Sequence, residues 1–562
     1  KHNLRSYLHH QVASTSMLSR QSSLAHSLRS WSLSLFAGPL HSGTRPPFSE
    51  STRSYAQRAA SKDRHAAAVV VGAGISGLCA ARRLRARFPE RKVVLLEKSS
   101  RPGGWIHSEN VHTDVAASYL SVQPSVSSAS LFFERGPRSL RAKGNGLHTL
   151  ALVRELGLTS HLVAGAEASK VRCLLLDSKL HYLPTSLVEA LQDPYIRPVL
   201  LDALKELFRP SRSTESGDES VYDFFRRRFS RHAAELFASS LTLGIFAASA
   251  KELSVRSCFP FLSDAEELSG SVVKGLLLGT SKSKQEAVLL RQLQADLVSD
   301  PSIAKCVRSG IFSFEHGLET LCTALLDELK RDPLVEVRFE EEVCEIARGQ
   351  QATGADYVVH TTGSVENSVT ASCIFWTGDT HHLAAALPAV SAQLQRDLSA
   401  VEYSSVSVVN VAFPKRFAEL VPHLRPTFGY LIPPREKQLL LGVTFDSCAF
   451  PEHDRGQPLS RFTAMLPYCA EMNDQQVSNR VLAEMHAHMK LTLDTVPIYM
   501  KVSHCKNAIP KYSLGHQSAT VQLLGRLAEE CAGVHLLGPL LAGVGINDCI
   551  ATANRVSDSI SL

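Results

Sequence analysis

Three glycines near the start of the chain have the spacing that binds the pyrophosphate of a dinucleotide. Gly72, Gly74 and Gly77 form a Gly-x-Gly-x-x-Gly motif. The first glycine allows a tight turn, the second lets the backbone approach the pyrophosphate, and the third lets a helix pack closely on a strand. Glu97 follows twenty residues after Gly77, where a carboxylate accepts hydrogen bonds from a ribose diol. These residues predict a dinucleotide site. The alternative is a glycine-rich turn in some other α/β unit.

The segments around this motif have the composition of elements that would position it. Ala66–Val71 and Val93–Leu96 are short apolar runs, and Leu78–Arg87 is rich in helix-forming residues. This order predicts a strand, a glycine turn, a helix and a second strand. The pyrophosphate would then lie at the positive end of the helix, against free N–H groups.

The alternation of apolar strands and helices returns in the second half of the chain. Strands are expected within Leu334–Ile346, from Ile374 and at Val534–Leu537, and a helix is expected at Ile546–Ile560. The cofactor domain is therefore predicted to be discontinuous, with other material inserted into it. Four more apolar runs predict a second sheet that could roof a substrate: Val406–Ala412, Phe428–Ile432, Leu439–Phe445 and Phe462–Leu466.

Composition indicates a globular protein of two or three domains. The chain has 562 residues, 44% of them hydrophobic and 20% charged. Its net charge of +6 comes entirely from residues 1–60, which hold seven Lys and Arg against one acid, whereas the remainder has 53 of each sign. Because the body of the protein is neutral, nucleic acid is not an expected partner.

The segment 1–64 has the composition of a mitochondrial transit peptide. It is rich in Arg and Ser, poor in acids, and interspersed with Leu, Phe and Trp. The alternative is a disordered tail that carries no address.

Several other kinds of site are not indicated. The twelve cysteines are scattered without a C-x-x-C pair, which favours structural thiols in a reducing compartment. His486 and His488 point to different sides of a helix, so they are poor metal co-ligands and are expected at the surface. No nucleophile triad or carboxylate pair is evident, and no apolar run is long enough to span a bilayer. We therefore predict no metal and no catalytic side chain.

One helix has two interpretations. A continuous apolar face runs along Ile196–Phe208 at helical spacing. It predicts either a helix that faces the core or one that lies in a membrane interface.

Two motifs after the second strand carry a family resemblance. Arg101–Trp105 has the R-x-G-G pattern of the FAD-binding amine oxidase and protoporphyrinogen oxidase superfamily, and Leu131–Arg138 resembles the F-E-x-G-P-R segment of the protoporphyrinogen oxidase family. Further stretches match that family, in its oxygen-dependent mitochondrial form, in the same order: Gly244–Ala247, Leu253–Pro260, Phe314–Leu318, Phe428–Pro433, Ile509–His516 and Gly538–Cys549. The likeness covers residues 66–562 apart from Val111–Ala129, which we interpret as an inserted surface loop or as retained non-coding sequence.

The resemblance implies an α/β fold in which a discontinuous Rossmann-like FAD-binding domain carries an inserted substrate-binding β-sheet domain and a helical membrane-binding domain. The expected divisions follow the order of the chain: a leader at 1–64, FAD-binding parts at 65–140, 311–385 and 506–562, a helical membrane-binding and substrate region at 141–260, a helical connector at 261–310, and the substrate sheet at 386–505.

The family's reaction is the six-electron oxidation of protoporphyrinogen IX to protoporphyrin IX in haem biosynthesis, with O₂ reduced to H₂O₂ and the flavin as hydride acceptor. The resemblance implies FAD contacts in addition to Glu97 and the glycine turn, which comprises Gly72, Ala73, Gly74, Ile75, Ser76 and Gly77. These further residues are Lys98, Trp105, Gly136, Pro137, Arg138, Ser139, Val343, Pro539, Val544, Gly545 and Ile546.

The same resemblance places five residues at the substrate. Arg138 is expected to bind a propionate and Leu431 to lie against the macrocycle, with Gly429, Thr444 and Met465 beside them. Thr444 stands where an apolar residue is commoner, and Leu466–Tyr468 replaces the family's Gly-Gly, so the local shape of the pocket is in question. Each of these side chains has an alternative as a core residue, or as a structural ion pair for Arg138.

Partners and location follow only from the resemblance. It implies a homodimer on the intermembrane-space side of the mitochondrial inner membrane, near ferrochelatase. Two other functions are alternatives. An FAD-dependent amine or polyamine oxidase should show an aromatic cage for the amine. A non-catalytic porphyrin-binding flavoprotein should have lost the glycine turn or the C-terminal helix motif.

Overall fold

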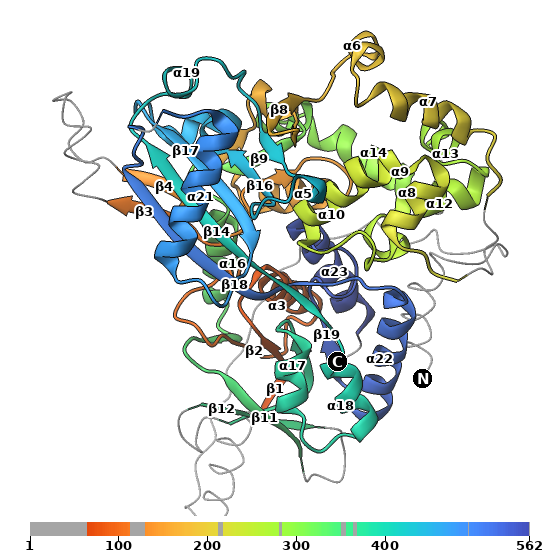
Figure 1. Cartoon of the computed structure of the whole chain (residues 1–562). Coiled ribbons are helices and arrows are strands. Elements are labelled where there is room, and N and C mark those ends of the chain that lie inside the picture. The colour runs from red at the N-terminus through yellow and green to blue at the C-terminus, as the bar shows by residue number, and fades with distance from the viewer. Residues whose placement is uncertain are drawn as a thin grey trace, which may run out of the picture.

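The computed structural model describes residues 65–112, 130–211, 217–279, 284–349, 356–362, 368–492 and 494–560. The expected leader therefore lies outside the described residues. Figure 1 shows a red, green and blue α/β region below, a mostly blue sheet at the upper left, and yellow-green helices at the upper right.

The α/β region is built on a largely parallel sheet from three separate parts of the chain. Its strands run in the order β10 (Val335–Arg338), β2 (Val93–Leu96), β1 (His65–Val71), β13 (Val369–Trp376), β12 (Tyr357–Thr361) and β11 (Val343–Arg348), and β19 (Val534–Leu536) pairs in parallel with β13. Parallel pairing extends from β10 to β19, and the β12 and β11 pairings are antiparallel. The prediction of a discontinuous Rossmann-like domain is confirmed.

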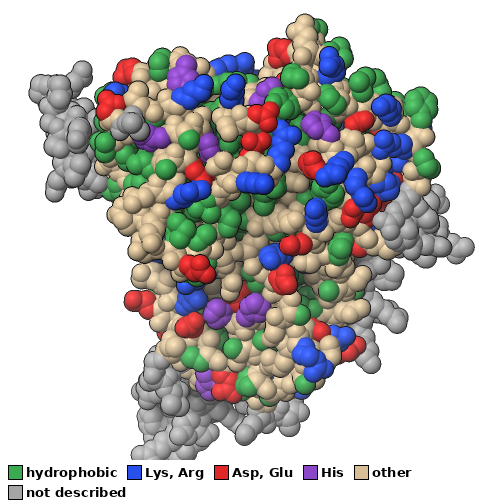
Figure 2. Space-filling view, viewed as in Figure 1, with side chains coloured by type: hydrophobic (Ala, Val, Ile, Leu, Met, Phe, Trp, Pro, Cys, Tyr) green, Lys and Arg blue, Asp and Glu red, His purple; other side chains and the backbone are tan. Residues whose placement is uncertain are grey.

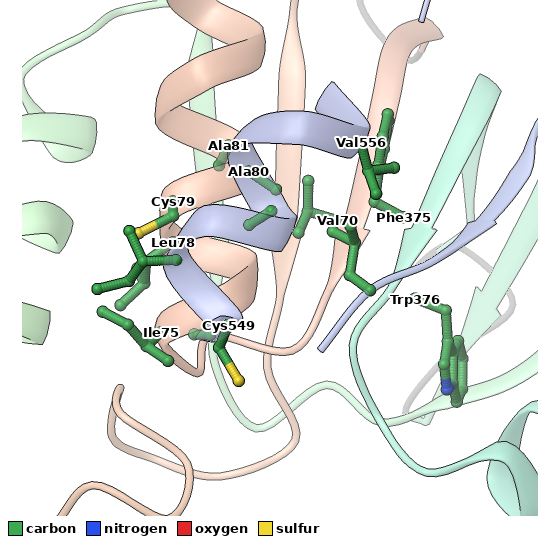
Figure 3. Packing of buried hydrophobic residues seen from close by; sticks show 14 of the residues in the cluster. Val70, Ile75, Leu78, Cys79, Ala80, Ala81, Phe375, Trp376, Cys549 and Val556 are labelled. Carbon is green, nitrogen blue, oxygen red and sulfur yellow. The ribbon is translucent and has the colours of Figure 1, made fainter. Parts of the chain in front are cut away.

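Two groups of helices pack against this sheet. The first contains α3 (Ile75–Arg87), α16 (Glu319–Lys330) and α23 (Ile546–Ser559), and the second contains α17 (Thr380–Ala386), α18 (Ala392–Ser399) and α22 (His516–Glu530). Figure 3 shows the close contact of α3 and α23, where Ile75 and Cys549 lie near each other in the core. All six helices contribute buried side chains to one hydrophobic core.

The second sheet is seven-stranded, in the order β18 (Tyr499–Pro510), β14 (Tyr403–Phe413), β17 (Ser460–Pro467), β16 (Gly442–Phe445), β15 (Gly429–Leu431), β7 (Cys173–Leu176) and β8 (Lys179–Tyr182). The helix α21 (Asp474–Met489) buries Val477, Val481 and Met485 in a core shared with this sheet. The strands β7 and β8 come from the segment expected to be helical. Pairing with β15 has overridden that expectation, because Cys173–Leu176 is buried along its whole length.

The helical region is larger than the sequence indicated. A core formed by Val221, Phe224, Phe246, Leu262 and Val272 joins the helices from both sides of the expected boundary at residue 260. The helices that contribute to this core are α8 (Val221–Arg228), the π-turn Ala234–Ala238, α10 (Ser239–Phe246), α11 (Val255–Cys258), α12 (Pro260–Ser269) and α13 (Val272–Leu278). The region also contains α9 (Arg231–Ala233), and α6 (Leu187–Gln192) and α7 (Arg197–Glu206) contribute Ala190 and the half-buried Leu200 to a separate cluster with Leu174 and Leu176 of β7. The segment 261–310 is thus more than a connector.

The remaining elements link this region to the cofactor domain. The helices α14 (Lys284–Leu297) and α15 (Pro301–Ser309) pack near α5 (Gly146–Glu155) and β6 (Leu162–Ala164). The strand β9 (Ile311–Phe314) lies between β5 (Leu140–Arg141) and β6 in a small sheet. Short helical turns at Thr159–His161, Glu167–Lys170, Phe417–Leu420, Pro434–Glu436, Asp446–Ala449 (α20) and Pro451–Asp454 complete the fold.

The expected insert begins later than predicted. Val111 belongs to β3 (Ser108–His112), which pairs with β4 (Ser130–Glu134) in an antiparallel ribbon. Most of the predicted loop, residues 113–129, lies outside the described residues.

Candidate functional site

The glycine turn joins β1 to α3, and its three glycines meet three different requirements. Gly72 has a φ of +100°, and a Cβ there would lie 2.3 Å from Thr377 Oγ1. A Cβ on Gly77 would lie 1.9 Å from the Gly72 carbonyl oxygen, so this glycine allows helix and strand to pack closely. A Cβ on Gly74 would meet no protein atom within 4 Å. The space beside Gly74 therefore suits a ligand that approaches the start of α3.

Glu97 directly follows β2, and its side chain reaches back to this turn. Its carboxylate accepts hydrogen bonds from Ala73 N, at 2.7 Å, and from the N–H and hydroxyl of Ser99, at 2.8 and 2.7 Å. The side chain is buried, and its carboxylate oxygens retain lone pairs for a further donor. Lys98, by contrast, is exposed and lies 3.9 Å from Glu342, next to Val343 at the start of β11.

The R-x-G-G motif folds as a turn against the glycine loop. Gly103 N donates to the Ala73 carbonyl at 2.8 Å, and the Arg101 guanidinium donates to three carbonyls of its own turn, those of Pro102, Gly104 and Ile106. Trp105 is 47% exposed. Gly136 packs beneath it, since a Cβ there would lie 2.0 Å from the Trp105 carbonyl oxygen. Pro137, Arg138 and Ser139 come next in the chain after Gly136, so they begin at the edge of this site.

The C-terminal motif closes the site from the third part of the chain. Gly538 follows β19 and lies beside both Thr377 and Ser76, so the carboxyl ends of β1, β13 and β19 meet at one edge. Tyr512 holds the loop that leads to α23, because its hydroxyl accepts from Gly543 N at 2.8 Å and donates to the Pro539 carbonyl. Burial raises the pKa of the Tyr512 phenol, which keeps this donor protonated.

The helix α23 begins at this same edge of the sheet. Gly545 is its exposed N-cap, and Val544 and Ile546 are half-buried beside it. Asp548 accepts from Asn145 Nδ2 at 2.7 Å and Asn547 donates to the Arg141 carbonyl at 3.0 Å, which fixes the first turn. Ile75 and Ser76 are buried, so they can offer a cofactor little besides their backbone. Taken together, these groups fit FAD at the carboxyl end of a parallel sheet.

The five expected substrate residues come together on or beside one sheet. In β15, β16 and β17, Gly429 pairs with Thr444, Leu431 with Gly442, and Gly442 with Met465. Since residues two apart in a strand share a face, Gly429, Leu431, Thr444 and Met465 all lie on the face opposite α21. Leu431 also packs against Gly244 of α10, where a Cβ would lie 2.8 Å from Leu431 Cδ2. Gly429 is required by the backbone, since it has a φ of +138° and a Cβ would lie 2.1 Å from the Val443 carbonyl oxygen.

Arg138 reaches this face from the cofactor side. Its Nε donates to Thr444 Oγ1 at 3.0 Å and lies 3.7 Å from Asp446 Oδ1. Burial lowers the pKa of the Arg138 guanidinium, and the charges of Asp446 and Glu134 partly oppose that effect. A largely buried cation beside apolar side chains is a favourable place for the carboxylate of a largely apolar ligand.

Glu134 is a titratable group that sequence reasoning missed. It ends β4 and accepts from Leu318 N and Ser108 Oγ, each at 2.8 Å. Burial raises its pKa to about 8, although these two hydrogen bonds and Arg138 act in the opposite direction. Asp446 and Tyr512 were missed as well. Tyr512 lies within the matched stretch Ile509–His516, and no spacing in the sequence predicts the contacts of either residue.

The histidine prediction needs correction. His488 is buried in α21, where Nδ1 bonds to Tyr430 Oη at 3.0 Å, because its side of the helix faces the sheet. Within the described parts of the chain, no group of His, Cys, Asp and Glu residues is arranged to hold a metal ion.

The chain is similar to known flavin-dependent proteins over most of its length. The family of flavin-containing amine oxidoreductases matches residues 75–561. The chain is similar to protoporphyrinogen oxidases from Macaca fascicularis and Homo sapiens, each 34% identical over 510 residues that cover 88% of this chain and 98% of the relative. A protoporphyrinogen oxidase from Dictyostelium discoideum is 28% identical, with the same coverage of both chains.

Solved structures show the same fold. A protein from Exiguobacterium sp. superposes with a TM-score of 0.67 at 21% identity, covering 88% of this chain and 98% of its own. Cyclohexylamine oxidase from Brevibacterium oxydans gives a TM-score of 0.57 at 13% identity, with 88% and 99% coverage. With these matches and the geometry of the glycine turn, the chain belongs to the family of flavin-containing amine oxidoreductases and is an FAD-dependent oxidase.

Proposed function

We propose that this protein oxidises protoporphyrinogen IX to protoporphyrin IX, with O₂ as the final acceptor and H₂O₂ as the second product. The observation that carries this proposal is Arg138, a largely buried cation beside a sheet face that bears Leu431 and Met465. A porphyrinogen is a broad apolar disc with propionates on one edge, which matches an apolar face with one cation. The similarity to curated protoporphyrinogen oxidases supports the same substrate.

In this proposal the side chains of the protein bind the substrate and orient it toward the cofactor. Arg138 pairs with a propionate, Leu431 and Met465 cover the macrocycle and exclude water, and the loop held by Tyr512 brings the start of α23 to the cofactor edge. FAD held by the glycine turn and the start of α23 would supply the hydride acceptor, with O₂ as the final electron acceptor. The proposal assigns no side chain as a proton donor or acceptor.

Purified protein in detergent tests this function directly. Under air, protoporphyrinogen IX should give porphyrin fluorescence well above autoxidation, with about three H₂O₂ per porphyrin because six electrons leave in pairs. Arg138→Ala should raise KM far more than it lowers kcat, since it removes a binding contact. Protein with bound flavin that leaves the porphyrinogen unchanged and oxidises an amine would instead place the chain with the amine oxidases.

The helical region also supports a peripheral place on a membrane. The exposed large apolar residues of α6, α7 and α13 are Leu187, Val188, Leu191, Leu201, Leu204, Leu276, Leu277 and Leu278, and they are joined by Leu207 and Phe208 just after α7. Figure 2 shows hydrophobic side chains in this upper right part of the molecule, with Lys and Arg side chains among them. Among the residues with assigned positions, no helix is long and apolar enough to cross a bilayer.

The helix α7 buries a charged side chain and exposes apolar ones. Its one fully buried residue is the charged Glu206, while Leu201, Leu204 and, just beyond the helix, Phe208 face outward, the last 88% exposed. Apolar surface of this extent is stable when something covers it. We propose that it lies in the interface of the mitochondrial inner membrane on the intermembrane-space side, where the protein is a homodimer that hands its product to ferrochelatase.

A further inference from the structure

A chain of hydrogen bonds connects Arg138 to Asp446 through the side chain of Thr444. Thr444 Oγ1 accepts from Arg138 Nε at 3.0 Å and can donate to Asp446 Oδ1 at 3.1 Å. On the neighbouring strand, Thr463 Oγ1 donates to Asp446 Oδ2 at 2.5 Å. The amide of Asn410 in turn donates to Thr463 Oγ1 at 3.0 Å. All of these groups are buried or half-buried.

The available acceptors set the direction of the hydrogen bonds in this chain. An ionised carboxylate can only accept, so the Thr463 hydroxyl donates to Asp446. The Thr444 hydroxyl has two acceptors, Asp446 Oδ1 at 3.1 Å and the Thr463 carbonyl at 3.3 Å, and its single proton goes to one of them. Asn410 occupies a lone pair of Thr463 and leaves that proton free for Asp446. The lone pair of Thr444 consequently faces Arg138 Nε, which needs an acceptor.

This arrangement fixes the Arg138 guanidinium through its Nε atom. Within the described structure, Arg138 has Thr444 as its hydrogen-bond partner, at Nε, and neither terminal nitrogen has one. Asp446 lies 3.7 Å from Nε, and its charge compensates the buried cation without occupying the outer edge of the fork. Two parallel N–H donors on a planar guanidinium match the two oxygens of one carboxylate.

We propose that Asp446 and Thr444 are positioning residues that hold Arg138 for bidentate recognition of a single carboxylate on the ligand. The site would then distinguish a porphyrin acid from its ester by geometry, because the local charge is already balanced by Asp446. The identity of that ligand rests on the proposed function, whereas the fork and its orientation do not. The inference predicts that removing one hydroxyl, that of Thr444, makes the protein indifferent to the ligand's carboxylate.

The test compares two ligands on the FAD-loaded enzyme. Protoporphyrin IX and its dimethyl ester are titrated by fluorescence into wild type, Thr444→Val, Thr444→Ser and Asp446→Asn. Valine matches threonine in shape and lacks the hydroxyl, whereas serine retains it, so the two variants form a matched pair. Flavin content and the thermal unfolding midpoint are measured for each protein.

Wild type should bind the acid more tightly than the ester. Thr444→Val and Asp446→Asn should weaken binding of the acid about tenfold, the usual effect of losing a hydrogen bond to a charged group, and leave binding of the ester unchanged. Thr444→Ser should behave as wild type. If Asp446→Asn fails to fold, the threonine pair alone decides the question.

Other outcomes overturn the inference. Equal weakening of acid and ester in Thr444→Val would mean that the hydroxyl only supports the sheet. Equal affinity of wild type for the two ligands would also overturn it, even where turnover of protoporphyrinogen upholds the proposed function. A preference for the acid that Thr444→Val abolishes, in a protein that does not oxidise porphyrinogen, would keep the inference and reject the proposed function.

Discussion

Glu206 of α7 and Arg228 of α8 form an ion pair in which both side chains have no exposed surface. Arg228 Nε donates to Glu206 Oε1 at 2.7 Å, and Glu206 also accepts from Ser271 Oγ and from the N–H groups of Val272 and Val273 at the start of α13. Burial alone would raise the Glu206 pKa, and these hydrogen bonds outweigh it and lower the pKa. One carboxylate thus ties α8 and α13 to α7, and α7 and α13 carry part of the apolar surface.

Removing the charge of one partner of this ion pair should lower the free energy of unfolding. Glu206→Gln leaves the buried Arg228 charge with Glu266, 3.4 Å from Nη1 and shared with Arg227, as its remaining counter-ion. The free energy of unfolding should therefore fall by about 3 kcal/mol, measured by urea denaturation. Replacing both residues by Met should recover most of that loss. The matched control is Glu235→Gln, which breaks the exposed Arg231–Glu235 pair and should cost less than about 1 kcal/mol. An equal, small effect of both single variants would contradict this account.

The apolar surface yields a prediction about membrane binding. Leu204→Glu combined with Phe208→Glu should release the protein from vesicles of phosphatidylcholine and cardiolipin in a flotation assay. Each large apolar side chain contributes about 2 kcal/mol when it leaves water, so affinity should fall by well over tenfold. Val496→Glu alters a side chain of similar exposure on the sheet domain and should float as wild type does. Flotation of the double variant at the wild-type level would reject the assignment of this surface.

Gly74 and Gly77 should respond differently to the same substitution. Gly77→Ala would place a Cβ 1.9 Å from a backbone oxygen, so it should lower the stability of the FAD-free protein by about 1–3 kcal/mol. Gly74→Ala meets no protein atom and keeps a φ of −70°, so stability should be unchanged while FAD binds at least about tenfold more weakly. Thermal unfolding without FAD, together with FAD titration, separates the two effects. If Gly74→Ala binds FAD with the affinity of the wild type, the cofactor does not approach the backbone at Gly74.

Glu134 should make stability depend on pH with a defined sign. Burial raises its folded-state pKa to about 8 from a model value of 4.5, so between these values the folded state holds a proton that the unfolded state has released. The contribution is therefore fully present below the unfolded pKa, falls as pH rises, and is lost by pH 8, with a slope of at most about 1.4 kcal/mol per pH unit. Charges on Arg138 and Glu319 act on the same group.

Urea unfolding at several pH values between 5.5 and 8.5 measures this slope. Glu134→Gln should flatten it, since glutamine does not titrate, whereas Glu419→Gln at an exposed position should leave it unchanged. Identical slopes in wild type and Glu134→Gln would contradict the assignment of this carboxyl.

The cofactor half of the molecule was predictable because its signals are local. The three glycines, the apolar strands beside them and Glu97 each act within one βαβ unit, and the structure builds that unit as expected. The third piece, from Val534 to Ile560, was recognisable from its own strand–turn–helix order. The family resemblance, rather than periodicity, pointed to Arg138, Leu431 and Met465.

The features that escaped prediction depend on contacts between distant segments. The strands β7 and β8 join the second sheet through a pairing with β15 that is about 250 residues away in the chain, and no periodicity encodes such a partner. The apolar face of Ile196–Phe208 could not be assigned to core or interface, because that depends on where Arg228 holds Glu206. Likewise, Glu134 and Asp446 acquire their roles only when Arg138 comes to lie beside them.

The most direct test of the central claim is an anaerobic single turnover. Protoporphyrinogen IX is mixed with the FAD-loaded enzyme without O₂, and the loss of oxidised flavin absorbance is followed in time. The account predicts that the absorbance falls to completion, that air restores it with release of H₂O₂, and that Arg138→Ala requires far more substrate for the same rate. A flavin that stays oxidised with porphyrinogen but loses its absorbance with a primary amine would contradict the account.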